Sequence, residues 1–264
     1  MVEHERQLGM TTEVRTTAAK PKTADMHPGP GFRVRPDIER PDEKTIAGLG
    51  RFETPAISDQ LNRLSTMMPE IRNLTDEHLN ILGPAVTVKS YPGDNLMVHK
   101  SLDIAQPGDV IVVDGHRSPL TAALGDLVSK KARHRGVAGF VVDGVIRDLP
   151  EIKRLGDFPV FARDVTPIGP MHRGPGEINY PIACGGVVVN PGDIIVGDLN
   201  GVVVVPREFA DPLLRRLEER KSAEAAYNAS VETGNFSNAW VDAILEDSGV
   251  VVNVAAAERK PNSF

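Results

Sequence analysis

The stretch of sequence that decides the fold is GDLVSKKARHRGVAGFVVDGVIRDL, residues 125–149. Asp126 is a residue type that favours the start of a helix, apolar residues then recur one turn apart, and Gly136 is suited to end the helix. The apolar run GFVV (139–142) follows this helix, and a similar run, VIVV (110–113), precedes it. The order strand, helix, strand predicts two neighbouring parallel strands joined by a right-handed crossover.

Further short runs of Val and Ile surround this unit, and they are AVTV (85–88), GVVV (186–189), DIIV (193–196) and VVVV (202–205). Such runs are typical of strands buried on both faces. Another helix is expected to start with Thr54 as its N-cap and Pro55 in its first turn. Two more are expected from Arg207 to about Ala229 and over 237–249. The mixture predicts a layered α/β domain with a mostly buried sheet.

Two segments resemble each other: PGDVIVVDG (107–115) and PGDIIVGDLNG (191–201). Each has a Pro-Gly-Asp turn, a strand, and a second turn with Asp or Asn before Gly. We interpret them as two hairpin-like edges of similar construction rather than as an internal duplication.

The composition is that of an ordinary globular protein with a substantial core. Of 264 residues, 41% are apolar and 25% are charged, and the net charge is -6. The balance argues against binding to nucleic acid through phosphates. No apolar stretch approaches the roughly 18 residues that span a bilayer, and the polar first residues do not form a signal peptide. We therefore expect a cytoplasmic protein with no membrane partner. The single cysteine, Cys184, is expected to be a small buried residue.

The chain divides by composition into three parts. Residues 1–45 are rich in Pro, Thr and charged residues and are expected to form a flexible arm or one that drapes over another subunit. Residues 46–206 contain the strand pattern and are expected to form the α/β domain. Residues 207–264 are expected to form a helical extension.

The start of the helix in the deciding stretch is a candidate anion site. The backbone N–H groups of Gly125, Asp126, Leu127 and Val128 lie where a helix leaves its first donors unpaired, and Gly125 allows close approach of a ligand. The basic residues 130–135 fall in the middle and last turn, where they complement the negative end of the helix dipole. They require no nucleic acid to explain them.

The segment DGVIRD (143–148) ends the following strand with two adjacent charges. Neighbours in an extended chain point to opposite faces, so we expect Arg147 and Asp148 not to pair with each other. In a parallel unit this loop emerges at the same sheet edge as Gly125, which predicts that the three residues converge. Arg147 would then bind a carboxylate or keto oxygen, and Asp148 would bind Mg²⁺. The alternative is a pair of solvated or salt-bridged loop charges.

From about Thr54 to Pro206 the chain resembles the family of 4-hydroxy-4-methyl-2-oxoglutarate aldolases and the related RraA-like regulators of ribonuclease E activity. The matching stretches are SDQL, GPAVTV, PGDNLMVH, PGDVIVVDG, GDLVSKKARHRGVAGFVVDGVIRDL, FPVFAR and VNPGDIIVGDLNGVVVVP. The resemblance implies a three-layer fold of the swivelling β/β/α type. It also implies homotrimers or homohexamers with active sites between subunits.

The resemblance also assigns roles to residues. It implies that pyruvate binds along the backbone of Gly125, Asp126, Leu127 and Val128. It implies that Arg147 contacts the substrate and that Asp148 holds a divalent metal. An acidic residue from the C-terminal helix of a neighbouring subunit would order water at the metal. Glu224 is the first choice for that residue, and Glu218 or Glu219 could also serve.

A lyase reaction follows from these roles. Cleavage of a bond beta to a ketone leaves an enolate whose charge must be stabilised. No lysine lies within an apolar strand as a Schiff-base aldolase requires, so Mg²⁺ or Mn²⁺ is the expected electron sink. Arg147 would neutralise the enolate, and Asp126 would orient the base that takes the 4-hydroxyl proton. Loss of CO₂ from oxaloacetate gives the same enolate and is expected as a companion activity.

Other features leave alternatives open. His99 is expected to be structural, because no second ligand is apparent near it. The loop at 169–181 could line the site or form a subunit contact. The helix around Trp240 could cap the site of a lyase for a different 2-oxo acid. A non-catalytic regulator that binds a ribonuclease or another protein is the second hypothesis, although Asp126, Arg147 and Asp148 together favour the lyase.

Overall fold

The computed structural model describes residues 29–250, and the helices and strands within this range are as follows. The strands are β1 (Phe32–Val34), β2 (Arg72–Asn73), β3 (Ile81–Ser90), β4 (Val110–Ala122), β5 (Gly139–Ile146), β6 (Val160–Val165), β7 (Gly176–Ile178), β8 (Ile182–Cys184), β9 (Val187–Val189), β10 (Ile194–Asp198) and β11 (Gly201–Val205). The helices are α1 (Glu43–Leu49), α2 (Thr54–Gln60), α3 (Leu96–Ser101), α4 (Asp126–His134), α5 (Leu149–Lys153), α6 (Ala210–Glu232) and α7 (Ala239–Asp247).

A nine-stranded mixed sheet forms the centre of the molecule, in the order β1-β7-β3-β4-β5-β6-β2, with β10 and β11 joined to it through β3. Strands β3, β4, β5 and β6 are parallel neighbours. Val110 of β4 pairs with Gly139 of β5, and α4 connects the two strands. The predicted strand, helix, strand unit is therefore confirmed.

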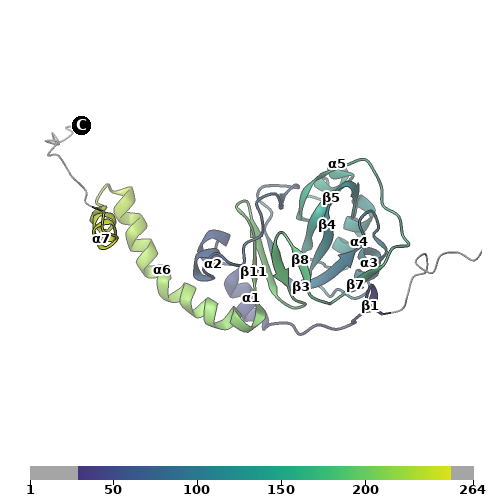
Figure 1. The fold of residues 1–264 in the computed structure, drawn as a ribbon, viewed down its shortest axis with the longest axis horizontal. Coiled ribbons are helices and arrows are strands. Elements are labelled where there is room, and N and C mark those ends of the chain that lie inside the picture. Colours follow the sequence, from purple (N-terminus) through teal and green to yellow (C-terminus); the bar gives the residue numbers. More distant parts are fainter. Residues whose placement is uncertain (1–28, 251–264) are drawn as a thin grey trace, which may run out of the picture.

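Three hydrophobic cores separate the layers that Figure 1 shows. The first lies between the parallel strands and the helices α3, α4 and α5. The second lies on the other face of the sheet, under β8, β9, β10 and β11. The third lies between the outer face of β10 and β11 and the helices α1, α2 and α6. Because β10 and β11 face a core on both sides, their side chains are almost all apolar.

The two similar segments adopt different structures, which corrects the prediction of two hairpin-like edges. Residues 191–201 do form a hairpin, in which Asp198 of β10 pairs with Gly201 of β11. Residues 107–115 instead lead into β4, which pairs in parallel with a strand on each side. A turn followed by an apolar run is common to an edge and to a central strand, so local sequence does not distinguish them.

Both ends of the α/β domain extend beyond the predicted boundaries. Strand β1 pairs in parallel with β7, and Thr45 of α1 is buried and donates its hydroxyl to Asp211 of α6 at 2.5 Å. Leu213 and Leu217 of α6 are buried in the third core. The parts of the predicted arm and extension at 32–45 and 210–217 thus pack on the body, while residues 1–28 and 251–264 lie outside the described range. After Leu217, α6 extends away from the sheet and leads to α7 (Figure 1).

Two helix starts differ from the prediction by one residue. Glu53 and Gly125 are the N-cap residues of α2 and α4, in place of Thr54 and Asp126. The Thr54 hydroxyl donates to the Asp198 carboxylate at 2.7 Å, so it holds α2 against the β10–β11 turn. Cys184 is buried, as predicted. Within residues 29–250, no helix has the length and apolar character needed to cross a bilayer.

Candidate active site

The start of α4 lies beside the end of β5. Gly125 has extended backbone dihedrals, and its carbonyl accepts from the Ser129 hydroxyl at 3.0 Å, which holds the first turn of the helix. The Arg147 N–H donates to the carbonyl of Leu124 at 3.0 Å. This hydrogen bond joins the residue just after β5 to the residue just before the N-cap of α4.

Arg147 and Asp148 are paired, with 3.2 Å between Arg147 Nε and Asp148 Oδ2. The prediction that they would not pair is wrong, because the alternation of side chains holds only within a strand. Strand β5 ends at Ile146, and Asp148 has a φ of 57° in the left-handed region, where it caps α5. The change of backbone direction turns both side chains to one side.

Gly125 lies directly against this pair. A Cβ atom added to Gly125 would collide with Asp148 Oδ2 and would lie 3.0 Å from Arg147 Cγ. The three residues therefore converge at one sheet edge. Both charged side chains remain partly exposed, Arg147 at 39% and Asp148 at 36%, so a ligand can reach them.

Asp126 adds a second carboxylate to the site. Its Oδ2 accepts from Lys130 Nζ at 2.5 Å, one turn along α4. This hydrogen bond is the main cause that lowers the pKa of the Asp126 carboxyl below its ordinary value, and smaller contributions come from the Leu127 N–H and the Asp148 side chain. Asp126 is therefore a carboxylate at neutral pH and a close neighbour of Asp148.

The two remaining residues of the helix start differ in their surroundings. The Val128 side chain is buried in the first core, whereas the Leu127 side chain is 64% exposed. Val128 therefore anchors the first turn of α4. Leu127 offers an apolar surface next to the charged groups.

The loop between β6 and β7 covers Arg147. Thr166 donates its backbone N–H to Ile146, and Ile168 accepts from the Ala122 N–H at 2.9 Å. A Cβ atom on Gly169 would collide with Arg147 Nη1. The sequence left open whether the loop at 169–181 lines the site or forms a subunit contact. Its first residue, Gly169, lies against the candidate site.

A histidine pair at the same loop was missed by the sequence analysis. The rings of His99 on α3 and His172 in the loop are edge to face, with centroids 5.4 Å apart. His172 Nδ1 lies 2.7 Å from Asn95 Oδ1. Burial, with smaller contributions from His172 and Lys131, lowers the pKa of His99. No spacing signal links two histidines that are so far apart in the chain, so only the fold reveals the pair.

The acidic residues proposed from the C-terminal helix all lie on the exposed part of α6. Glu218 Oε1 is 2.5 Å from Arg51 Nη2, so this side chain is paired within its own chain. Glu219 and Glu224 have no hydrogen bond or ion pair to another described residue. Across residues 29–250, no three His, Cys, Asp or Glu side chains are grouped as metal ligands, so a metal here would rely on one or two carboxylates and water.

The fold and the site together define a mixed α/β protein in which a helix start and a strand end form an open, charged edge. A sequence profile described as Aldolase/RraA matches residues 54–204, and the chain belongs to this RraA-like family. A relative from Halalkalibacterium halodurans is 42% identical over 186 residues, which is 70% of this chain and 88% of the relative. That relative is provisionally named a 4-hydroxy-4-methyl-2-oxoglutarate aldolase.

Two solved structures support the same fold. RraAS2 of Streptomyces coelicolor, described as an unusual member of the RNase ES inhibitor RraA family, has a TM-score of 0.66 and 31% identity, and covers 73% of this chain and 99% of its own. The RNA-processing inhibitor RraA of Thermus thermophilus has a TM-score of 0.53 and 30% identity, and covers 59% of this chain and 93% of its own. The predicted RraA-like α/β fold is confirmed.

Proposed function

We propose that the protein is a divalent-metal-dependent lyase that cleaves 2-oxo acids of the 4-hydroxy-4-methyl-2-oxoglutarate type to pyruvate. The observation that carries the proposal is the meeting of Gly125, Arg147 and Asp148 at one exposed edge. The site offers a cation, carboxylates and main-chain N–H groups within a small space. A pyruvyl group, with a keto oxygen next to a carboxylate, is complementary to that set.

The substrate carboxylate is expected to lie along the start of α4. The first N–H groups of a helix have no partners within the helix, and the helix dipole favours an anion there. Gly125 matters because any side chain at this position would occupy the space of Asp148 and Arg147. Arg147 would contact the keto oxygen and offset the negative charge that develops on it as the bond beta to the ketone breaks.

Asp148 and Asp126 fit a hydrated divalent cation. Two neighbouring carboxylates, one of them 36% exposed, suit a Mg²⁺ or Mn²⁺ ion that keeps most of its water. When bound, such an ion supplies Lewis acidity toward the keto group. Asp126, ionised because of Lys130, would accept a hydrogen bond from the water that removes the 4-hydroxyl proton.

Oxaloacetate decarboxylation is proposed as a companion activity at the same site. Loss of CO₂ from oxaloacetate leaves the pyruvate enolate, which is also the product of the retro-aldol step. The same groups that stabilise the charge in one reaction therefore stabilise it in the other.

We also propose that the protein acts as a homotrimer or homohexamer. The part of α6 beyond Leu217 is exposed within residues 29–250, so it could contact a neighbouring subunit. Glu224 is favoured over Glu218 as the acidic residue that a neighbour contributes, because Glu218 is paired with Arg51.

The test is to incubate the protein with oxaloacetate and Mg²⁺ and to measure pyruvate with a coupled dehydrogenase. We expect metal-dependent pyruvate formation that is abolished by EDTA and by Asp148→Ala. Asp157→Ala is the matched control, because Asp157 is an exposed carboxylate paired with Arg133 on the far end of α4. Pyruvate formation that is equal with and without EDTA, or unchanged in Asp148→Ala, would refute the proposal.

A non-catalytic regulator is the second candidate function. Two solved relatives are described as inhibitors or members of an inhibitor family of RNA processing, and α6 and α7 provide an exposed surface for a partner. Co-purification with a ribonuclease of the RNase E type, in the absence of any metal-dependent pyruvate formation, would favour this function over the lyase.

A further inference from the structure

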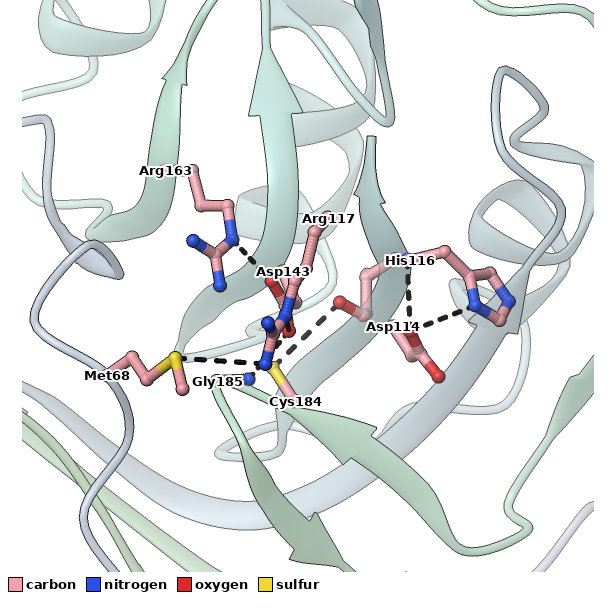
Figure 2. A network of polar contacts seen from close by, with 9 residues as sticks. Met68, Asp114, His116, Arg117, Asp143, Arg163, Cys184 and Gly185 are labelled. Carbon is pink, nitrogen blue, oxygen red and sulfur yellow. Dashed lines mark hydrogen bonds and ion pairs between the residues drawn. The ribbon is translucent and has the colours of Figure 1, made fainter. Parts of the chain in front are cut away.

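Charged side chains form a row across the ends of four neighbouring strands. Lys89 of β3 is in register with Asp114 of β4, and Asp114 is in register with Asp143 of β5. Arg163 of β6 completes the row, with its Nε 2.5 Å from Asp143 Oδ1 (Figure 2). Two carboxylates on adjacent strands repel each other unless cations or donors neutralise them.

This row, which we call the charged row (Lys89, Asp114, Asp143 and Arg163), lies on the face of the sheet away from α4. Val113 and Val142, which precede the two aspartates, point into the first core with α3, α4 and α5. Side chains alternate along a strand, so Asp114 and Asp143 point toward the β8–β9 side, as Val112 and Val141 do. None of the candidate active-site residues belongs to the charged row.

A cavity of about 580 Å³ opens over the charged row. Lys89, Asp114 and Asp143 line its polar side together with Arg117, and Ile182 and Val188 of the β8–β9 hairpin line its apolar side. Five of the ten residues that line it are charged or titratable, so a cavity of this size suits a small polar ligand.

The hydrogen-bonding capacity of Asp143 is satisfied by the protein. Its two oxygens accept from Arg163 Nε at 2.5 Å and from the Gly185 N–H at 2.7 Å. Arg117 Nε lies 3.9 Å from Asp143 Oδ2. Asp143 therefore serves to hold the two arginines in place.

Asp114 is not satisfied in this way. Its side chain is only 9% exposed, and Oδ1 accepts from the His116 N–H at 3.0 Å. The other oxygen has no hydrogen-bond partner among residues 29–250, and His116 Nδ1 lies 3.8 Å from Oδ1. This oxygen is not fully buried and faces the cavity, where a ligand can donate a hydrogen bond to it.

Donors without acceptors lie on the same row. Arg163 Nη2 is buried and has no hydrogen-bond partner among residues 29–250, although Arg163 does not line the cavity. Lys89 makes no ion pair within 4.0 Å to any other residue in the described part of the chain. Lys89 and Arg117 thus line the cavity as cationic donors beside the Asp114 carboxylate, which is the complement of a ligand that carries both an anion and a donor.

The backbone at the cavity is held in an unfavourable conformation. His116 and Arg117 are consecutive residues with φ values of 54° and 55°, in the left-handed region that favours glycine. They form an irregularity in β4, where the register with β5 shifts between Asp114 and Ser118. Such bulges redirect side chains next to functional sites, and here the bulge carries Arg117 to the rim of the cavity.

We propose that this cavity binds a small carboxylate that carries a hydroxyl or ammonium group on the carbon next to the carboxyl group. Arg117 and Lys89 bind the carboxylate, and Asp114 accepts a hydrogen bond from the hydroxyl or ammonium group. This site is separate from the edge formed by Gly125, Arg147 and Asp148, and it does not depend on the lyase activity.

The test uses three four-carbon diacids that differ only at one carbon: L-malate, L-aspartate and succinate. Binding to the full-length protein is measured by titration calorimetry in EDTA and low salt, so that metal-dependent binding does not contribute to the measured heat. We expect malate or aspartate to bind, and the better of the two identifies a hydroxyl or an ammonium donor. Succinate, which has neither group, is expected to bind at least tenfold more weakly.

Variants locate the binding. Arg117→Gln is expected to weaken it at least tenfold, whereas Asp148→Asn and Arg154→Gln leave it unchanged, since Arg154 is an exposed arginine paired with Glu151 elsewhere. Arg117→Gly removes the side chain and suits the left-handed backbone, so it is expected to lose binding without any fall in Tm.

Four outcomes overturn the proposal. They are no binding of any diacid to the wild-type protein at millimolar concentration, equal binding of succinate, unchanged binding by Arg117→Gln, and loss of binding in Asp148→Asn.

Discussion

Asp148 shows how one backbone conformation can build a site. Asp148 follows the end of β5 by two residues, and its left-handed φ of 57° leads the chain directly into α5. Among residues other than glycine, Asp and Asn adopt this conformation most readily, because a short polar side chain can bond to nearby backbone. The same residue can therefore turn the chain and present a carboxylate beside Arg147.

Asp148→Asn is the sharpest single test of the proposed chemistry. Asparagine keeps the shape and tolerates the left-handed backbone, but it removes the negative charge. We expect kcat/KM for both pyruvate-forming reactions to fall at least about 10²-fold, since metal-assisted stabilisation of charge is lost. A coupled pyruvate assay measures the effect, and urea unfolding should show a free energy close to that of the wild type. A loss of only one of the two activities would contradict a shared site.

Gly125→Ala tests the close approach at the start of α4. The added methyl group would meet Asp148 Oδ2 and the Arg147 side chain, so both groups must move. Displacement of catalytic groups by about 1 Å can cost about 10² in rate, and we expect a loss of kcat/KM of that order.

Gly144→Ala, in β5, is the control for Gly125→Ala. A Cβ atom at Gly144 would have only ordinary contacts, the nearest of them 3.7 Å from Val142. The control is expected to retain activity. Equal activities of the two variants in the pyruvate assay would refute the role of Gly125.

His99 gives the protein a predictable response to pH. The pKa of His99 is lowered by burial, so the unfolded chain takes up its proton at a higher pH than the folded chain. The contribution of His99 to stability is therefore complete above pH about 6.5 and is lost as the pH falls through the folded pKa.

The measurement is urea unfolding at about pH 7.5 and about pH 5.5. We expect the wild-type protein to lose more free energy of unfolding between the two than His99→Gln does. His78→Gln, at an exposed histidine, should follow the wild-type profile. Identical losses in the wild type and in His99→Gln would mean that His99 does not contribute.

At the scale of elements, α6 has two parts with different environments. Its first turns bury Leu213 and Leu217 in the third core, and its later turns are exposed. Composition alone placed the whole helix in an extension, because 9 of its 23 residues are charged, which is typical of an exposed helix. Only the position of the hairpin β10–β11 beneath it decides that one end is core.

Leu213→Ala is expected to destabilise the protein by about 2–4 kcal/mol, since it removes a buried leucine and leaves a cavity. Val231→Ala, on the exposed part of α6, should change the free energy of unfolding by less than about 0.5 kcal/mol. Urea unfolding of both variants measures the difference. If Leu213→Ala is as stable as Val231→Ala, the start of α6 is not part of the core.

At the scale of the whole molecule, the proposed site is incomplete within one chain if Glu224 serves a neighbour. Subunits that carry Asp148→Asn should then complement subunits that carry Glu224→Gln when the two are mixed. After mixed refolding, about a quarter of the sites combine an intact Asp148 with an intact Glu224 from another subunit. We expect activity to return in the mixture, and its absence, with assembly verified by light scattering, would contradict sharing between subunits.

The amino-acid sequence by itself determined the central strand, helix, strand unit and the approach of Gly125 to Arg147 and Asp148. These depend on short-range signals and on the rule that parallel strands end at one sheet edge. The tertiary structure alone decided which residues come together: Arg147 with Asp148, His99 with His172, and the charged row of Lys89, Asp114, Asp143 and Arg163. Such groupings depend on strand register and on left-handed backbone at single residues, which are set by packing across the whole sheet and leave no local pattern in the chain.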